Sequence, residues 1–109
     1  MNDTRNYGKE NTSTYLVQKF IASEKSHEIK LLPIDIVILF IIARYLDMPK
    51  GECFAGQKTL GRECRISAEY FGDRCIYLVQ QKVIFRFIRG KGFGYNLGEL
   101  LTGIDPYND

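Results

Sequence analysis

Residues 52–97 limit the fold of this chain more than any other stretch. Their first half predicts two short helices, over residues 57–64 and 68–81, with a tight turn between them. Ser67 stands directly before the second helix, where a serine side chain caps free N–H groups and contributes about 1 kcal/mol relative to alanine. The pattern therefore predicts a helix pair in which the second helix has a defined start.

The second half of this stretch predicts two strands joined by a glycine-rich tip. Residues 83–89 are apolar except for Arg86 and Arg89, and residues 95–97 begin a return strand. The tip between them contains Gly90, Gly92 and Gly94. A helix, a turn, a helix and a hairpin in this order are typical of a winged helix-turn-helix with a C-terminal β-hairpin wing. We therefore expect an α+β fold that is mainly α.

The chain has 109 residues, which suffices for one domain with its own core. Residues 1–14 are polar and predict a flexible arm. Residues 15–98 form the expected winged-helix domain. Residues 99–109 are expected to be an acidic tail, or a linker to a further C-terminal domain.

Two apolar segments precede the helix pair. Residues 15–21 are strand-like, and residues 33–46 predict a helix that begins at a proline, which suits the first helical turn. That helix has two apolar faces where a surface helix needs one, so it is either central in the domain or shared with a second subunit. For a homodimer, the expected interface residues are Tyr15, Val17, Phe20, Ile36, Phe40 and Ala43.

Charge is distributed unevenly along the sequence. The formal net charge of +2 is too small to indicate a nucleic-acid partner by itself. Between residues 84 and 97, however, the only charged residues are Arg86, Arg89 and Lys91, a local +3. Such an uninterrupted basic hairpin favours contact with phosphates.

The sequence offers little for catalysis, metal binding or membrane insertion. Its cysteines are Cys53, Cys64 and Cys75, and its only histidine is His27, so no zinc-ligand cluster or catalytic constellation is formed. We expect buried reduced thiols, no cofactor and no enzymatic activity. The longest apolar run is too short for a membrane span, so a soluble cytoplasmic protein is expected.

A family resemblance extends over about residues 15–97. The matching residues are Cys53-Phe54, Gln57-Lys58-Thr59-Leu60-Gly61, Ile66-Ser67, Leu78, Val83-Ile84 and Tyr95-Asn96-Leu97. In this order they resemble the winged helix-turn-helix at the front of RepA-type replication initiators of plasmids and phages. The sequence departs from that pattern at Lys82, where the family has glycine, and at Ala55-Gly56, where it has Pro-Ser.

The resemblance implies sequence-specific binding of double-stranded DNA by a homodimer. Its site would be repeats in the replication origin of a plasmid, phage or satellite, with replication proteins as further partners. The expected DNA-binding residues are Gln57, Lys58, Thr59, Ser67, Glu69, Tyr70, Asp73, Arg74, Tyr77, Arg86, Arg89 and Lys91. The wing and the start of the first helix would hold phosphates, and the second helix would face the bases.

Two alternatives remain open at this point. A small transcriptional repressor would use the same fold, because a fold does not decide a function. A protein-interaction module without DNA binding is favoured by Glu69 and Asp73, which give the second helix an acidic face where a basic one is expected.

Overall fold

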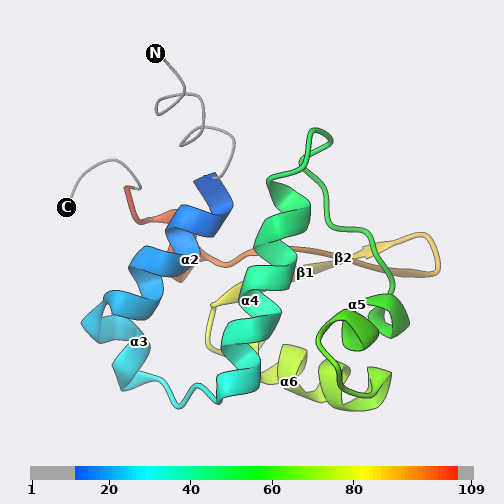
Figure 1. Cartoon of the computed structure of the whole chain (residues 1–109), viewed down its shortest axis with the longest axis horizontal. Coiled ribbons are helices and arrows are strands. Elements are labelled where there is room, and N and C mark those ends of the chain that lie inside the picture. Colours follow the sequence, from blue (N-terminus) through cyan, green and yellow to red (C-terminus); the bar gives the residue numbers. More distant parts are fainter. Residues whose placement is uncertain (1–11, 106–109) are drawn as a thin grey trace.

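The computed structural model describes residues 12–105 (Figure 1). Its elements are α2 (Thr12–Ala22), α3 (Glu24–Glu28), α4 (Pro33–Leu46), α5 (Gln57–Glu63), α6 (Ala68–Gln80), β1 (Ile84–Arg89), β2 (Gly92–Leu97) and α7 (Glu99–Thr102). Within the described part, the fold is α+β and mainly helical, with one two-stranded antiparallel sheet, as the sequence predicts. The predicted arm up to residue 11 and the predicted tail from residue 106 lie outside the described residues.

The apolar patch over residues 15–21 is helical, so its interpretation as a strand is wrong. Leu16, Val17 and Phe20 are buried at helical spacing, and they hold α2 against the core. Residues 12–14 belong to the same helix, and the predicted arm therefore does not reach residue 14. Short apolar runs fit a strand or a helix equally well, and here packing against α4 decides.

The start of α2 is capped by a residue distant in the sequence. Asp47, at the end of α4, accepts hydrogen bonds from the backbone N–H groups of Ser13 and Thr14 at 2.8 and 3.0 Å. It also accepts one from the Thr14 hydroxyl at 2.6 Å. A carboxylate at this position satisfies free N–H groups and opposes the helix dipole, so it ties α2 to α4.

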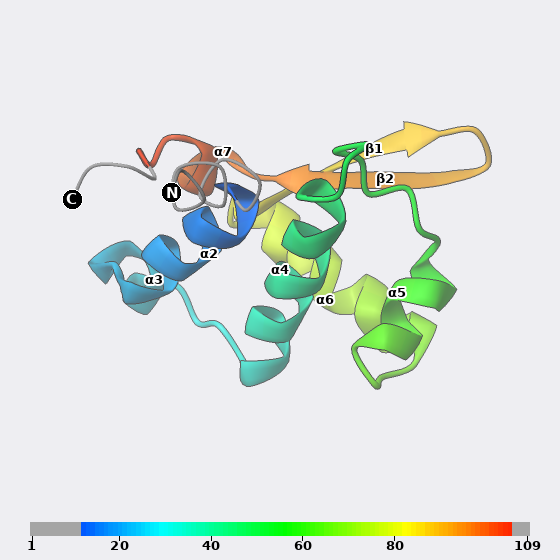
Figure 2. The same ribbon diagram turned by 45° about the horizontal axis from the view of Figure 1, so that its top comes forward.

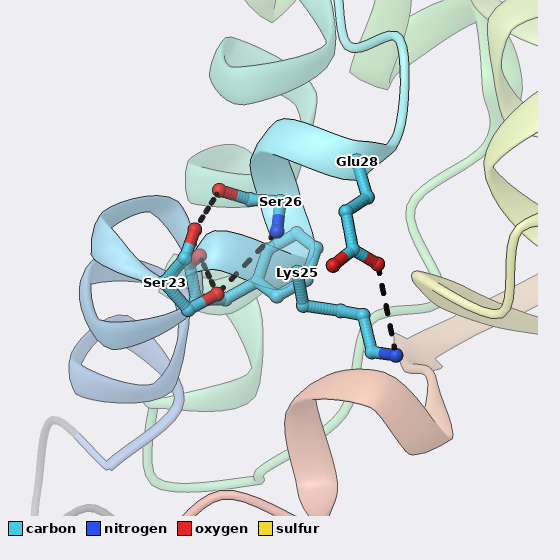
Figure 3. Close-up of polar contacts among 5 residues, drawn as sticks. Ser23, Lys25, Ser26 and Glu28 are labelled. Atoms are coloured by element: carbon cyan, nitrogen blue, oxygen red, sulfur yellow. Dashed lines mark hydrogen bonds and ion pairs between the residues drawn. The ribbon is translucent and has the colours of Figure 1, made fainter.

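The short helix α3 has a local cap (Figure 3). The Ser23 hydroxyl accepts a hydrogen bond from the backbone N–H of Ser26 at 3.4 Å, and Ser26 donates through its own hydroxyl to the Ser23 carbonyl at 2.9 Å. Lys25 and Glu28 form an exposed ion pair at 3.9 Å. These contacts stay within α3 and its cap and lie at the end of the molecule farthest from the hairpin (Figure 1).

Helix α4 has the predicted bounds and occupies the centre of the fold. Ile38, Leu39, Ile42 and Ala43 have no exposed surface. Figure 1 shows α4 between α2 on one side and the α5–α6 pair on the other. Helix α2 of the same chain therefore covers the second apolar face of α4. Of the two predicted arrangements, the structure shows a helix that is central in the domain.

This packing corrects half of the predicted dimer surface. Val17, Phe20 and Ala43 are fully buried within one chain, so a partner subunit has no access to them. Tyr15, Ile36 and Phe40 are partly exposed. The prediction was wrong for these three residues because the apolar face that it assigned to a second subunit packs inside the domain.

The predicted helix pair and hairpin are confirmed. The backbone turns at Arg65, which has a φ of 65°, and the Ser67 hydroxyl accepts a hydrogen bond from the backbone N–H of Tyr70 at 3.0 Å. In the hairpin, Ile84 is paired with Leu97 at one end of the ladder. Figure 2 shows the hairpin extending along one side of the molecule and past α5.

The segment after the hairpin is part of the domain, which corrects its interpretation as a tail from residue 99. Residues 99–102 form α7, and Leu101 is fully buried. Figure 2 shows α7 beside α2, with which it is in contact. The sequence signal for this buried helix is the pair of adjacent leucines, Leu100 and Leu101, because a solvated tail does not need two large apolar side chains.

The three cysteines are free and buried, as predicted. Burial raises the pKa of Cys53 and Cys64 to about 11 and that of Cys75 to about 12. These thiols keep their protons in the folded chain at a pH where the unfolded chain loses them. Their contribution to stability is therefore complete below about pH 9 and is lost as the pH rises toward 11.

We predict that none of the three cysteines reacts with a thiol reagent in the folded protein at pH 8, because the thiolate is the reactive form. In denaturant all three react. Between pH 9 and 10, the free energy of unfolding falls by about 1 kcal/mol for each thiol. Absorbance of the released thiol reagent and urea unfolding measure the two effects. Rapid reaction of one cysteine in the native state would contradict the burial described here.

Lys82 connects α6 to β1 in a left-handed backbone conformation with a φ of 63°. An L-residue pays about 1 kcal/mol there that glycine avoids. We predict that Lys82→Gly raises the free energy of unfolding by about 0.5 kcal/mol or more, since the lost ion pair with Glu99 is exposed.

The matched control is Gln81→Gly, because Gln81 has a φ of −85° and gains nothing from glycine. That variant is expected to lose about 0.5–1 kcal/mol. Urea unfolding of both variants gives the comparison. Equal losses in the two variants would contradict the conformational argument.

Candidate nucleic-acid interface

The outward face of α6 carries most of the residues predicted to contact bases. Ser67, Glu69, Tyr70 and Asp73 are exposed, although the Ser67 hydroxyl also caps the helix. Ile76 lies on the same helix with 47% of its surface exposed. The exposed face of α6 is thus acidic and partly apolar.

Arg74 does not belong to this face, which corrects its predicted role. Its guanidinium donates two hydrogen bonds to Asp35 of α4, from Nε to Oδ1 at 2.8 Å and from Nη2 to Oδ2 at 2.7 Å. The side chain of Asp35 is 0% exposed and that of Arg74 is 18% exposed. The hydrogen bonds to Asp35 raise the pKa of Arg74 above its ordinary value. This guanidinium is used inside the fold.

Asp35 serves two helices at once. Its Oδ2 also accepts the backbone N–H of Leu32 at 2.7 Å, which closes the first turn of α4. The Arg74 guanidinium lies over the ring of Tyr77, 4.8 Å from its centroid, so Tyr77 is half-buried as well. Arg74 therefore fixes α6 against α4 through Asp35, and this contact orients the exposed face of α6.

At the start of α5, the three predicted phosphate contacts differ in accessibility. The Gln57 side chain donates a hydrogen bond to the carbonyl of Ala68 at 2.7 Å and holds α5 against α6. Lys58 and Thr59 are exposed. The structure therefore leaves Lys58 and Thr59 available at this helix start, while Gln57 has a structural contact.

The three basic residues of the hairpin do not form one patch. Successive side chains of a strand point to opposite faces, so Arg86 and Arg89 lie on opposite faces of the sheet. The Arg86 guanidinium is half-buried over the ring of Phe93, 4.3 Å from the centroid. Arg89 and Lys91 are exposed near the tip.

Aromatic side chains support the hairpin on the face that carries Arg89. The Arg89 guanidinium lies 3.8 Å from the ring centroid of Phe54, and Phe54 packs edge-on against Phe87 at 6.0 Å. Gly94 lies beneath these rings, because a Cβ there would stand 2.4 Å from the Phe87 ring. Cys53 also pairs with β2 on its outer edge. These contacts hold the hairpin against Cys53 and Phe54, in the loop that leads into α5.

Exposed cations that the sequence interpretation missed lie near the turn between α5 and α6. Arg62 and Arg65 are both exposed and line a groove with Arg44. Their signal in the sequence is two arginines close together, one near the end of the predicted first helix and one in the turn that leads to Ser67. The basic part of the α5–α6 pair is therefore α5 with its turn.

Neither a metal site nor a membrane span is found in the described residues. Within residues 12–105, no group of three His, Cys, Asp or Glu side chains is placed to hold a metal ion. None of the helices in that range has the length and apolar character needed to cross a bilayer. Comparison of the chain with protein-family models, with curated proteins and with solved structures finds no match.

Proposed function

We propose that this chain is a winged helix that binds double-stranded DNA sequence-specifically. The observation that carries the proposal is the placement of Arg89 and Lys91, which are exposed near the tip of a hairpin that projects past α5 (Figure 2). Two cations on a braced hairpin suit the phosphates of a DNA backbone. The neighbouring α6 exposes Ser67, Glu69, Tyr70 and Asp73, whose side chains can form hydrogen bonds with base edges in a major groove.

The proposed contacts divide into two kinds. Phosphates would be held by Lys58, Thr59, Arg89 and Lys91, and bases would be contacted by Ser67, Glu69, Tyr70 and Asp73. An acidic side chain in the major groove can accept a hydrogen bond from the N4 amino group of cytosine. Gln57, Arg74, Tyr77 and Arg86 would act by holding the other residues in place.

The resemblance to RepA-type initiators supports a more specific proposal. The DNA site would be repeats in the replication origin of a mobile element, and other replication proteins would be further partners. A transcriptional repressor with the same DNA-binding surface is the nearest alternative, and occupancy of an origin or of a promoter in cells separates the two.

We also propose that the chain binds DNA as a homodimer. Within the predicted surface, Tyr15, Ile36 and Phe40 remain accessible to a partner. Light scattering is expected to give a protein mass near twice the 12.6 kDa of one chain, both for the free protein and, after the mass of the DNA is subtracted, for its DNA complex. A monomer mass in both conditions would contradict the dimer and leave DNA binding as a separate question.

The direct test of DNA binding is a titration of a labelled random-sequence duplex at several salt concentrations. With Lys58, Arg89 and Lys91 as contacts, the slope of log K against log salt is expected to be about −3 or steeper, since each phosphate contact contributes about −0.9. Absence of binding up to about 100 μM protein at low salt, the weak end of non-specific binding, would contradict the proposal.

A second candidate function is protein interaction through α6. It is favoured by Tyr70 and Ile76, which are 41% and 47% exposed beside Glu69 and Asp73. Aromatic and apolar side chains on an otherwise polar helix are frequent in protein interfaces. This candidate replaces the first if no DNA is bound.

A further inference from the structure

An open groove lies between the C-terminal half of α4 and the end of α5. Its volume is about 460 Å³, and it is lined by Ile41, Arg44, Arg62, Glu63 and Arg65. Three arginines and one glutamate give this groove a formal charge of +2. The groove is therefore basic, whereas the exposed face of α6 is acidic.

The single acidic side chain of the groove is already neutralised. Glu63 accepts a hydrogen bond from the Arg44 guanidinium at 2.5 Å through Oε1 and another from the Tyr45 hydroxyl through Oε2. Within residues 12–105, the side chains of Arg62 and Arg65 form no hydrogen bond or ion pair. Two exposed guanidinium groups therefore remain available to a ligand.

The backbone at Arg65 has a defined left-handed conformation. Arg65 has a φ of 65°, a conformation that favours glycine, and the turn is closed by hydrogen bonds from Arg65 N–H to the Arg62 carbonyl and from Ile66 N–H to the Gly61 carbonyl. Arginine therefore occupies a position where glycine would be less strained. A long cationic side chain on a rigid turn is suited to holding an anion.

The shape and position of the groove favour a phosphate of a long polymer. Guanidinium groups bind phosphate through paired hydrogen bonds, and an open groove admits a continuous backbone. Arg65 stands two residues before Ser67, which caps α6. A backbone phosphate in the groove would thus lie close to the start of the helix proposed to face the bases.

We propose that Arg62 and Arg65 bind phosphates of duplex DNA in this groove, with Arg44 and Glu63 as its wall. The identity of the ligand rests on the proposed function, whereas the phosphate site itself does not. The groove adds a second set of backbone contacts to those proposed for the hairpin tip.

The test compares two charge-matched double variants in the duplex titration. Arg62→Gln/Arg65→Gln is expected to weaken binding about 50-fold at about 0.1 M salt and to flatten the salt slope by about 1.8, as for two lost phosphate contacts. The control is Lys25→Gln/Lys30→Gln, which removes two exposed charges near α3. It is expected to change binding less than about 3-fold, since charges more than a Debye length away are screened. Equal effects of the two variants would overturn the proposal.

A second measurement separates this proposal from the function it rests on. Inorganic phosphate is titrated into the wild-type protein while the side-chain Nε–H signals of its arginines are followed by NMR. Shifts at Arg62 and Arg65 that saturate, with Arg74 unchanged as internal control, support the phosphate site even if no DNA is bound. Unchanged signals at Arg62 and Arg65 would overturn it even if DNA is bound.

Discussion

Replacing Arg74 with alanine is expected to lower the free energy of unfolding by about 3–5 kcal/mol. Asp35 is completely buried and receives two hydrogen bonds from Arg74 at 2.7 and 2.8 Å. Without the guanidinium, the carboxylate stays buried with only the backbone N–H of Leu32 as a partner among these contacts. A buried charge with no counter-charge is costly because the interior solvates it poorly. Urea unfolding followed by circular dichroism measures the loss.

The control for Arg74 is Arg44→Ala, which removes a guanidinium that is 59% exposed from its ion pair with Glu63. That loss is expected to stay below about 1 kcal/mol, because the guanidinium is largely solvated and Glu63 keeps the Tyr45 hydroxyl as a donor. Arg74→Lys keeps the charge and is expected to recover only part of the stability, since lysine cannot form the paired hydrogen bonds. Similar losses for Arg74→Ala and Arg44→Ala would show that the buried pair does not hold α6 to α4.

Removing the two cations at the hairpin tip is expected to weaken duplex binding strongly. For Arg89→Ala/Lys91→Ala we expect about 50-fold weaker binding at about 0.1 M salt and a salt slope flatter by about 1.8. The effect should be similar for all DNA sequences, because phosphate contacts carry no sequence information. Fluorescence anisotropy with a random duplex and an enriched duplex measures both quantities.

Arg86→Ala is the internal comparison for the hairpin. Arg86 lies on the other face of the sheet over Phe93, so its loss should affect stability more than DNA affinity. Strong weakening by Arg86→Ala combined with no effect of the tip variant would contradict the proposed orientation of the hairpin on DNA.

Local signals were sufficient to predict much of this fold. The proline at the start of α4, the Ser67 cap and the run of β-branched and aromatic residues before Gly90 each specify structure within a few residues. The bounds of α4 agree with the prediction, and those of α5, α6 and β1 agree within one residue, whereas β2 begins at Gly92, three residues before the predicted start at Tyr95. Elements with strong end signals and clear periodicity are those that a sequence specifies locally.

Contacts between distant residues could not be predicted in this way. Arg74 looked like an exposed residue of α6, and only its pairing with Asp35, 39 residues earlier, gives it a structural role. The spacing of apolar residues over 15–21 fits either a strand or a helix. Their helical form depends on packing against α4 and on the cap from Asp47. The same limit applies to the candidate site. The sequence identified polar and basic residues that could contact DNA, but it did not show which of their side chains are exposed and which bind other residues of the fold.

We propose that this chain recognises a DNA sequence through α6 and its hairpin. Selection of bound duplexes from a random pool tests it most directly. We predict enrichment of a defined sequence by the wild-type protein. We also predict an altered sequence preference for Glu69→Ala/Asp73→Ala, with non-specific affinity changed less than about 3-fold, because these side chains are assigned to bases. A pool that shows no enrichment even at low salt would contradict the claim and favour a protein partner for α6.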